Sequence, residues 1–171
     1  MKKLLFYSVC LLVMLASCKK NKSVAPSNTI TATVGGTTET FNKIILAQLS
    51  NGLELGSSLI ISAASSGDEN ADGMSIVLNL NNSITNQAYT NTGNFGEVSV
   101  TYVKGPTSFV NPNAYSTDPN GTYLTTVTIT SLSNTNVQGT FSGQLLFSDG
   151  KTVKSVTNGK FNVNLSQGVQ Q

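Results

Sequence analysis

The chain has 171 residues, a length that fits a single domain. Ser, Thr and Asn occupy 61 positions, charged residues make up only 11%, and His, Arg and Trp do not occur. This composition excludes catalysis by histidine, zinc sites with a histidine ligand, arginine forks for phosphate and tryptophan platforms for sugars, and it favours a secreted all-β domain.

The first 17 residues have the layout of a secretory signal peptide. A short positive start, Met1-Lys2-Lys3, precedes a run of twelve almost wholly apolar residues over 4–15. Twelve residues are too few to span a membrane, which takes about 20, but they suit the apolar core of a leader that is removed. The sequence therefore predicts a signal peptide over residues 1–17.

The leader closes with Leu15-Ala16-Ser17-Cys18, which resembles the lipobox of bacterial lipoproteins. In that family the cysteine thiol receives a diacylglyceryl group, cleavage precedes the cysteine, and its new amino group is acylated. The resemblance implies that Cys18 is lipidated and anchors the protein in the outer membrane. The other cysteine, Cys10, lies in the leader, so the mature domain has no thiol for a disulfide.

Residues 18–27 are expected to be the lipidated cysteine and a flexible tether. From residue 28 onward, eight acidic residues outnumber five lysines, which gives a net charge of −3. Phosphate binding needs clustered cations, so this balance argues against a nucleic-acid partner.

Residues 28–166 are predicted to form one antiparallel β-sandwich of about ten strands with hairpin connections, or alternatively a lipocalin-like barrel. Apolar and polar residues alternate with a period of two, as in half-buried strands. Both central residues of a type I′ hairpin turn need positive φ, which Asn, Asp and Gly tolerate best. The predicted turns are Gly35-Gly36, Asn51-Gly52, Asp149-Gly150 and Asn158-Gly159.

In chain order, the apolar residues of segment 41–49 have a spacing that fits either a helix or a strand, and the β-branched residues favour a strand. An apolar run of this kind suits a strand covered on both faces. Inward faces are then predicted at alternate residues over 76–80, 98–102 and 127–129. The longest alternating run covers 137–147, and its glycines, Gly139 and Gly143, permit bending or close packing by a neighbour. Residues 167–171 are expected to be a C-terminal tail.

The layout also resembles that of small uncharacterised lipoproteins of Bacteroidota. The resemblance rests on segments 32–36 (ATVGG), 127–130 (VTIT), 139–142 (GTFS) and 158–161 (NGKF), the last read as a hairpin. It implies an antiparallel β domain on an envelope lipid anchor, and no activity. In that phylum, surface-exported lipoproteins often carry an acidic stretch after the cysteine. Lys19, Lys20 and Lys22 stand there instead, which favours the periplasmic face of the outer membrane.

One string has the pattern of a metal site. Asp68, Asn70 and Asp72 place oxygen ligands at alternate positions before Gly73, which resembles the first half of a calcium-binding EF-hand loop. The twelfth position of such a loop, a glutamate in EF-hands, is Asn79 here. A polar turn between two strands produces the same string, so a calcium site and a plain turn both remain open.

The stretch 105–121 is the longest without a predicted strand, and long loops are often functional. Phe109 and Tyr115 within it, with Tyr123 just beyond, are candidate ligand-binding residues, and a glycan is the ligand class that tyrosines with abundant Asn and Thr would suit. The alternative is that these aromatic residues only pin the loop to the domain.

No catalytic residues are predicted, and the protein is expected not to be an enzyme. The eight acids form no recognisable pair, and a serine nucleophile would need a lysine base. The expected role is a non-catalytic binding or scaffolding module with a glycan or an envelope protein as partner. The alternatives are a glycan-binding or calcium-assisted recognition domain and, behind these, a hydrolase without histidine.

Overall fold

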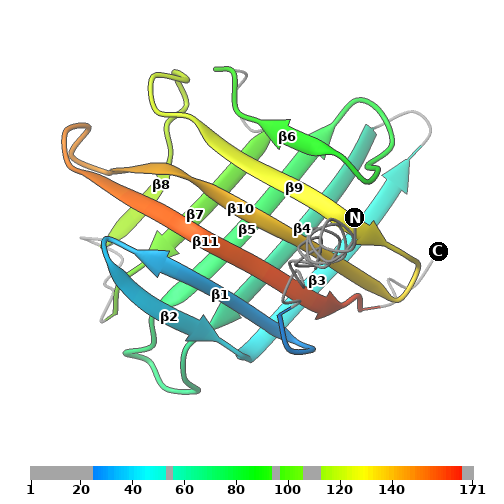
Figure 1. Ribbon diagram of the computed structural model, residues 1–171, viewed down its shortest axis with the longest axis horizontal. Coiled ribbons are helices and arrows are strands. Elements are labelled where there is room, and N and C mark those ends of the chain that lie inside the picture. The colour runs from blue at the N-terminus through cyan, green and yellow to red at the C-terminus, as the bar shows by residue number, and fades with distance from the viewer. Residues whose placement is uncertain (1–24, 53–55, 94–96, 106–112, 167–171) are drawn as a thin grey trace, which may run out of the picture.

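A computed structural model of the chain describes residues 25–52, 56–93, 97–105 and 113–166 (Figure 1). These residues form eleven strands and no helix, so the predicted all-β class is confirmed. It follows that no described segment is an apolar helix long enough to cross a membrane. The strands are β1 (Thr29–Val34), β2 (Thr37–Phe41), β3 (Lys43–Gly52), β4 (Gly56–Ala64), β5 (Gly73–Leu80), β6 (Ala88–Thr90), β7 (Val98–Val103), β8 (Ala114–Thr117), β9 (Thr125–Leu132), β10 (Asn136–Phe147) and β11 (Val153–Asn164).

The strands form one antiparallel sheet that curls into two facing layers (Figure 1). One layer runs in the order β2, β1, β11, β10, β9 and β6, and the other contains β7, β5, β4 and β3, whose strands run across the first. β10 connects the layers, because its first part pairs with β9 and its last residues, Leu145–Phe147, pair with β8. β8 therefore forms the corner of the sheet.

The far edge of the sheet approaches the end of β11. Directly after that strand, the N–H of Ser166 donates to the carbonyl of Ala47 in β3 at 2.7 Å. Two facing layers agree with the predicted sandwich, and the curl that brings β3 back toward β11 agrees with the barrel-like alternative.

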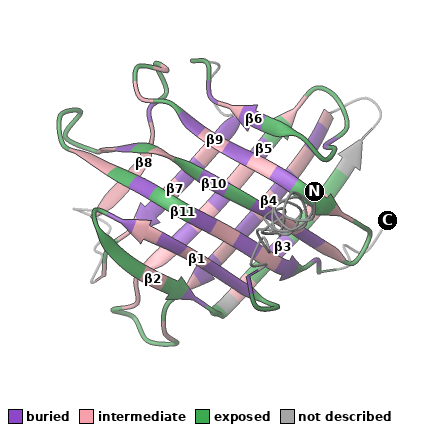
Figure 2. Cartoon of the chain, viewed as in Figure 1, coloured by how far each residue is buried: buried purple, intermediate pink, exposed green. Residues whose placement is uncertain are grey.

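The core consists of the apolar positions of the alternating pattern (Figure 2). In β4 and β7 every second residue is buried, and burial alternates in the same way along most of β5 and β9. The predicted inward faces are therefore confirmed. Their fully or almost fully buried members include Ile76, Leu78, Val100, Tyr102, Val127 and Ile129.

Two phenylalanines of the core pack against glycines of the neighbouring strand. In the β10–β11 pair, Gly139 lies opposite Phe161 and Phe141 lies opposite Gly159. A side-chain carbon added to either glycine would collide with the ring of the facing phenylalanine. Each glycine therefore makes room for one ring, and the predicted close packing at Gly139 is confirmed. The two ring centroids are 6.4 Å apart.

Two of the four predicted turns are found. Gly35 and Gly36 join β1 to β2 with φ of +56° and +91°, as a type I′ turn requires. Asp149 and Gly150 join β10 to β11, and the carboxylate of Asp149 accepts hydrogen bonds from the backbone N–H groups of Lys151 and Thr152.

The turn predicted at Asn158-Gly159 is wrong. Both residues lie inside the continuous strand β11, where the pairing register shifts and Asn158 has φ of +54°. A β-bulge needs the same backbone conformation as a tight turn, so the dipeptide alone does not separate the two. Asn51-Gly52 also differs from the prediction, because these are the last residues of β3 and the chain reverses after them.

Two further segments differ from expectation. The stretch 105–121 contains β8, which pairs with both β7 and β10. The strand predicted over 41–49 is confirmed as the end of β2 and most of β3, but Leu46 is 43% exposed. β3 is an edge strand whose register with β4 shifts between Lys43 and Leu46, so the segment is not covered on both faces.

The predicted leader and Cys18 lie outside the described residues, as do the tail and Phe109. The first described residue, Ala25, is already buried against the domain, and its carbonyl accepts a hydrogen bond from the side-chain amide of Asn162 at 3.0 Å. Ala25, which falls within the range expected for the tether, thus contacts the domain.

Candidate functional site

Four polar side chains meet where β2 of one layer approaches β5 and β7 of the other. Tyr102 lies in β7 and Lys104 directly follows it, Asp72 directly precedes β5, and Glu39 lies in β2. β5 and β7 pair in a register that brings Asp72 next to Lys104, and β2 supplies Glu39 from the opposite layer. We call these four residues the carboxylate cluster.

The two carboxylates share the same hydroxyl and the same ammonium group. The Tyr102 hydroxyl lies 2.9 Å from Oε1 of Glu39 and 3.2 Å from Oδ2 of Asp72, as the donor to both. Nζ of Lys104 donates to Oδ2 of Asp72 at 2.6 Å and lies 4.0 Å from Oε1 of Glu39. The N–H of Gly105 donates to the second oxygen of Asp72 at 2.8 Å.

The pKa values of the two acids in the cluster are shifted in opposite directions. Burial raises the pKa of Glu39, and the neighbouring Asp72 carboxylate raises it further, while Oε2 of Glu39 is buried without a hydrogen-bond partner. Burial opposes ionisation of Asp72 too, but hydrogen bonds from Lys104 and Gly105 outweigh it and lower its pKa. Asp72 therefore loses its proton more readily than Glu39 does.

Burial and the two carboxylates raise the pKa of Tyr102 well above its ordinary value, so its hydroxyl stays protonated and acts as a donor. The ring of Tyr102 is buried and packs edge-on against Phe41 of β2, with centroids 6.4 Å apart. The carboxylate cluster ties β2 to the opposite layer through the hydrogen bond between Tyr102 and Glu39. A glycosidase instead needs its two carboxyl groups on either side of the bond to be cleaved.

The structure places the predicted calcium ligands in two separate hydrogen-bond networks. The carboxylate of Asp68 closes its own turn by accepting from the N–H of Asn70 at 2.9 Å and from the hydroxyl of Ser66 at 2.7 Å. Asp72 belongs to the carboxylate cluster. Within the described ranges, no three Cys, His, Asp or Glu residues are grouped to hold a metal ion. Calcium binding at this turn stays a prediction.

Of the candidate aromatic residues, the structure describes Tyr115 and Tyr123, and no ring contact joins these two. Tyr115 of β8 is half-buried, with its ring 4.9 Å from that of Phe147 and Nζ of Lys154 4.8 Å from its centroid. Tyr123 is also half-buried and lies in the turn before β9. Tyr115 was predicted either to bind a ligand or to pin its loop to the domain. Its contacts with Phe147 and Lys154 are those of the second role.

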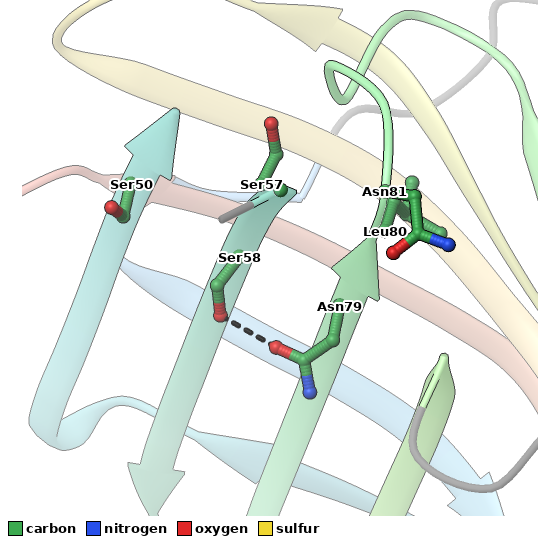
Figure 3. Close-up of a pocket in the computed structure, with 7 residues that line it drawn as sticks. Ser50, Ser57, Ser58, Asn79, Leu80 and Asn81 are labelled. Atoms are coloured by element: carbon green, nitrogen blue, oxygen red, sulfur yellow. Dashed lines mark hydrogen bonds between the residues drawn. The ribbon is translucent and has the colours of Figure 1, made fainter. Parts of the chain in front are cut away.

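A shallow pocket of about 280 Å³ lies at the ends of β3, β4 and β5 (Figure 3). Its wall is mainly hydroxyl and amide groups, and the Ser58 hydroxyl donates to the side-chain oxygen of Asn79 at 2.7 Å. Ligand pockets are usually larger, at about 300–1,000 Å³, and mostly apolar. The lining residues are Ser50, Gly56, Ser57, Ser58, Asn79, Leu80 and Asn81.

Sequence reasoning missed the carboxylate cluster. Asp72 was predicted as a calcium ligand, and Tyr102 as an inward-facing core residue. Glu39 lies far from both residues in the chain. The pairing of β5 with β7 would have placed Asp72 beside Lys104. No spacing signal places β2 of the other layer at this point.

Comparison of the chain with protein-family models, with curated proteins and with solved structures finds no match.

Proposed function

We propose that this protein is a lipid-anchored domain of the bacterial envelope, held at the periplasmic face of the outer membrane, that acts as a non-catalytic binding or scaffolding module. The observation that carries the proposal is the sequence Leu15-Ala16-Ser17-Cys18 at the end of an apolar leader. The position of Ala25 supports it, because this residue contacts the domain and lies only seven residues after the cysteine that would carry the lipid.

The absence of catalysis is proposed from the chemistry of the side chains. The mature chain has no histidine, and its cysteine is assigned to the lipid. The most reactive group of side chains in the described ranges, the carboxylate cluster, uses its hydroxyl and ammonium donors on its own carboxylates. Such internal pairing favours a structural role over turnover of a substrate.

Glycan recognition is the second candidate function. The pocket in Figure 3 favours it, since its serine and asparagine side chains can exchange hydrogen bonds with sugar hydroxyl groups. The lack of an aromatic ring in its lining limits the affinity that such a site can reach.

The lipid anchor is tested by replacing Cys18 with alanine in cells grown with labelled palmitate. The variant should lose the label and be left uncleaved or unanchored, because the thiol that accepts the lipid is missing. Cys10→Ala is the matched control, since that thiol lies in the leader, and it should keep both the label and the membrane location. Labelled Cys18→Ala protein would refute the anchor.

A further inference from the structure

The place where the chain enters the domain is held by a group of asparagines. The carbonyl of Ala25 accepts from Asn162, and the side-chain oxygen of Asn28 accepts from the N–H of Asn164 at 2.9 Å. The side-chain amide of Asn136 in turn donates to the side-chain oxygens of Asn162 and Asn164, at 3.0 and 3.1 Å. The entry point is therefore attached to the end of β11 and the start of β10.

The surface around this entry point is made by four pieces of chain. The exposed residues Pro26–Asn28 lead into β1, and the turn Ser133–Thr135 joins β9 to β10. Leu165 and Ser166 follow β11 and bond to the carbonyls of Thr135 and Ala47, which brings the exposed Leu46 of β3 to the same place. We call this surface the anchor end; it consists of residues 26–28, 133–135, 164–166 and Leu46.

The distance from Cys18 to the anchor end is short. Seven residue steps separate Cys18 from Ala25, and a fully extended chain of that length spans at most about 25 Å. The far hairpin of the domain lies at the other end of β10 and β11, strands of 12 residues each, which corresponds to about 40 Å. Lipid on Cys18 therefore holds the anchor end within about 25 Å of the membrane, whereas the hairpin can lie up to about 40 Å further away.

The charge distribution agrees with this placement. No acidic residue and no lysine occurs in segments 25–30, 131–138 and 161–166, which contribute the anchor end. Among the acids that the structure describes, Glu39 and Asp72 lie in the carboxylate cluster and Asp149 in the far hairpin. Anionic headgroups repel acidic side chains over about a Debye length, so the anchor end is the part of the domain that can approach them without repulsion.

We propose that the anchor end is a membrane-facing surface, which lies against the lipid headgroups with Leu46 as its apolar contact and points the β10–β11 hairpin away from the membrane. The inference rests on the proposed lipid anchor and adds an orientation to it. The partner is a lipid surface.

The test uses the lipidated protein in vesicles of phosphatidylethanolamine and phosphatidylglycerol that contain a nitroxide-headgroup lipid. Because Cys18 carries lipid and Cys10 is removed, a fluorophore can be placed on one introduced thiol, Asn134→Cys at the anchor end or Lys151→Cys in the far hairpin. Both positions are exposed in turns. Quenching should be several-fold stronger at position 134 than at position 151.

Two leucines that are exposed in the described part of the chain give a matched pair of variants. Leu46 is 43% exposed in the anchor end and Leu124 is 55% exposed in the turn before β9, where its carbonyl accepts from Gln144. Leu46→Glu should weaken quenching at position 134, because it brings a negative charge against the headgroups, whereas Leu124→Glu should leave it unchanged.

The outcomes separate the orientation from the anchor. Equal quenching at positions 134 and 151 in protein that floats with the vesicles would overturn the orientation and leave the anchor standing. Unchanged quenching in Leu46→Glu would overturn the role of Leu46 as the contact. Protein that does not float with the vesicles would overturn the anchor and the orientation with it.

Discussion

Replacing Phe141 by alanine is expected to lower the free energy of unfolding by about 3–5 kcal/mol, as truncation of a large buried aromatic residue does. Phe141 is 3% exposed, and its ring occupies the space that Gly159 leaves on the neighbouring strand. An alanine would leave that space empty, and a glycine opposite it cannot fill the cavity. Urea unfolding of a soluble form of residues 24–171, followed by circular dichroism, measures the loss.

Phe147→Ala is the matched control for this prediction. Phe147 lies on the same strand as Phe141, six residues further on, but it is only half-buried. Its truncation should cost clearly less than that of Phe141, because fewer contacts are lost. A cost below about 1 kcal/mol for Phe141→Ala would mean that the inward face of β10 has been assigned to the wrong side.

Replacing Asp118 by alanine is expected to cost about 2–3 kcal/mol, because several hydrogen bonds to one charged group are lost together. Asp118 is only 2% exposed, and its carboxylate accepts from the backbone N–H groups of Asn120, Thr122 and Tyr123. Its carbonyl also accepts from the side-chain amide of Asn91, which ties the turn to β6. Without the carboxylate, the turn that leads into β9 loses its internal acceptor.

The cost of Asp118→Ala should depend on pH in a defined direction. Hydrogen bonds from backbone N–H groups, first that of Asn120, lower the pKa of Asp118 in the folded protein. The stabilisation is therefore present above the unfolded-state pKa of about 3.9 and is lost as the pH falls through the folded-state value. Unfolding curves of wild type and variant should converge at low pH.

Asp149→Ala is the control for Asp118. Asp149 accepts a similar set of hydrogen bonds in its turn, but it is exposed to solvent. Water can replace the lost acceptor there, so the loss of stability should be smaller than at Asp118. Equal losses at the two positions would show that burial of the Asp118 turn does not matter.

The period-two pattern was enough to predict the class of the fold and most of its inward faces. Burial on one side of a strand depends only on the residues of that strand, as Ile76, Leu78 and Val100 illustrate. The bulge at Asn158 could not be separated from a turn, because both use a residue with positive φ. The strand β8 was missed because its four residues, all half-buried, show no alternation.

The carboxylate cluster could not be predicted, because it depends on how two layers meet. Glu39 was one of eight acids that form no recognisable pair in the sequence, and only the curl of the sheet brings it to Tyr102 and Asp72. The two aspartates of the predicted calcium string have different partners for the same reason. Asp68 accepts from Asn70, two residues further on, so the local sequence is enough to predict its turn. Asp72 instead accepts from Lys104, which follows the neighbouring strand β7.

The lipid anchor is the central claim of the functional account, and the mass of the N-terminal peptide of the membrane-extracted protein tests it most directly. Mass spectrometry of the peptide released by proteolysis should find a chain that begins at Cys18 and carries a diacylglyceryl group on the thiol and an acyl group on the amine. A peptide that still joins Ser17 to Cys18, or that begins with an unmodified Cys18, would contradict the account.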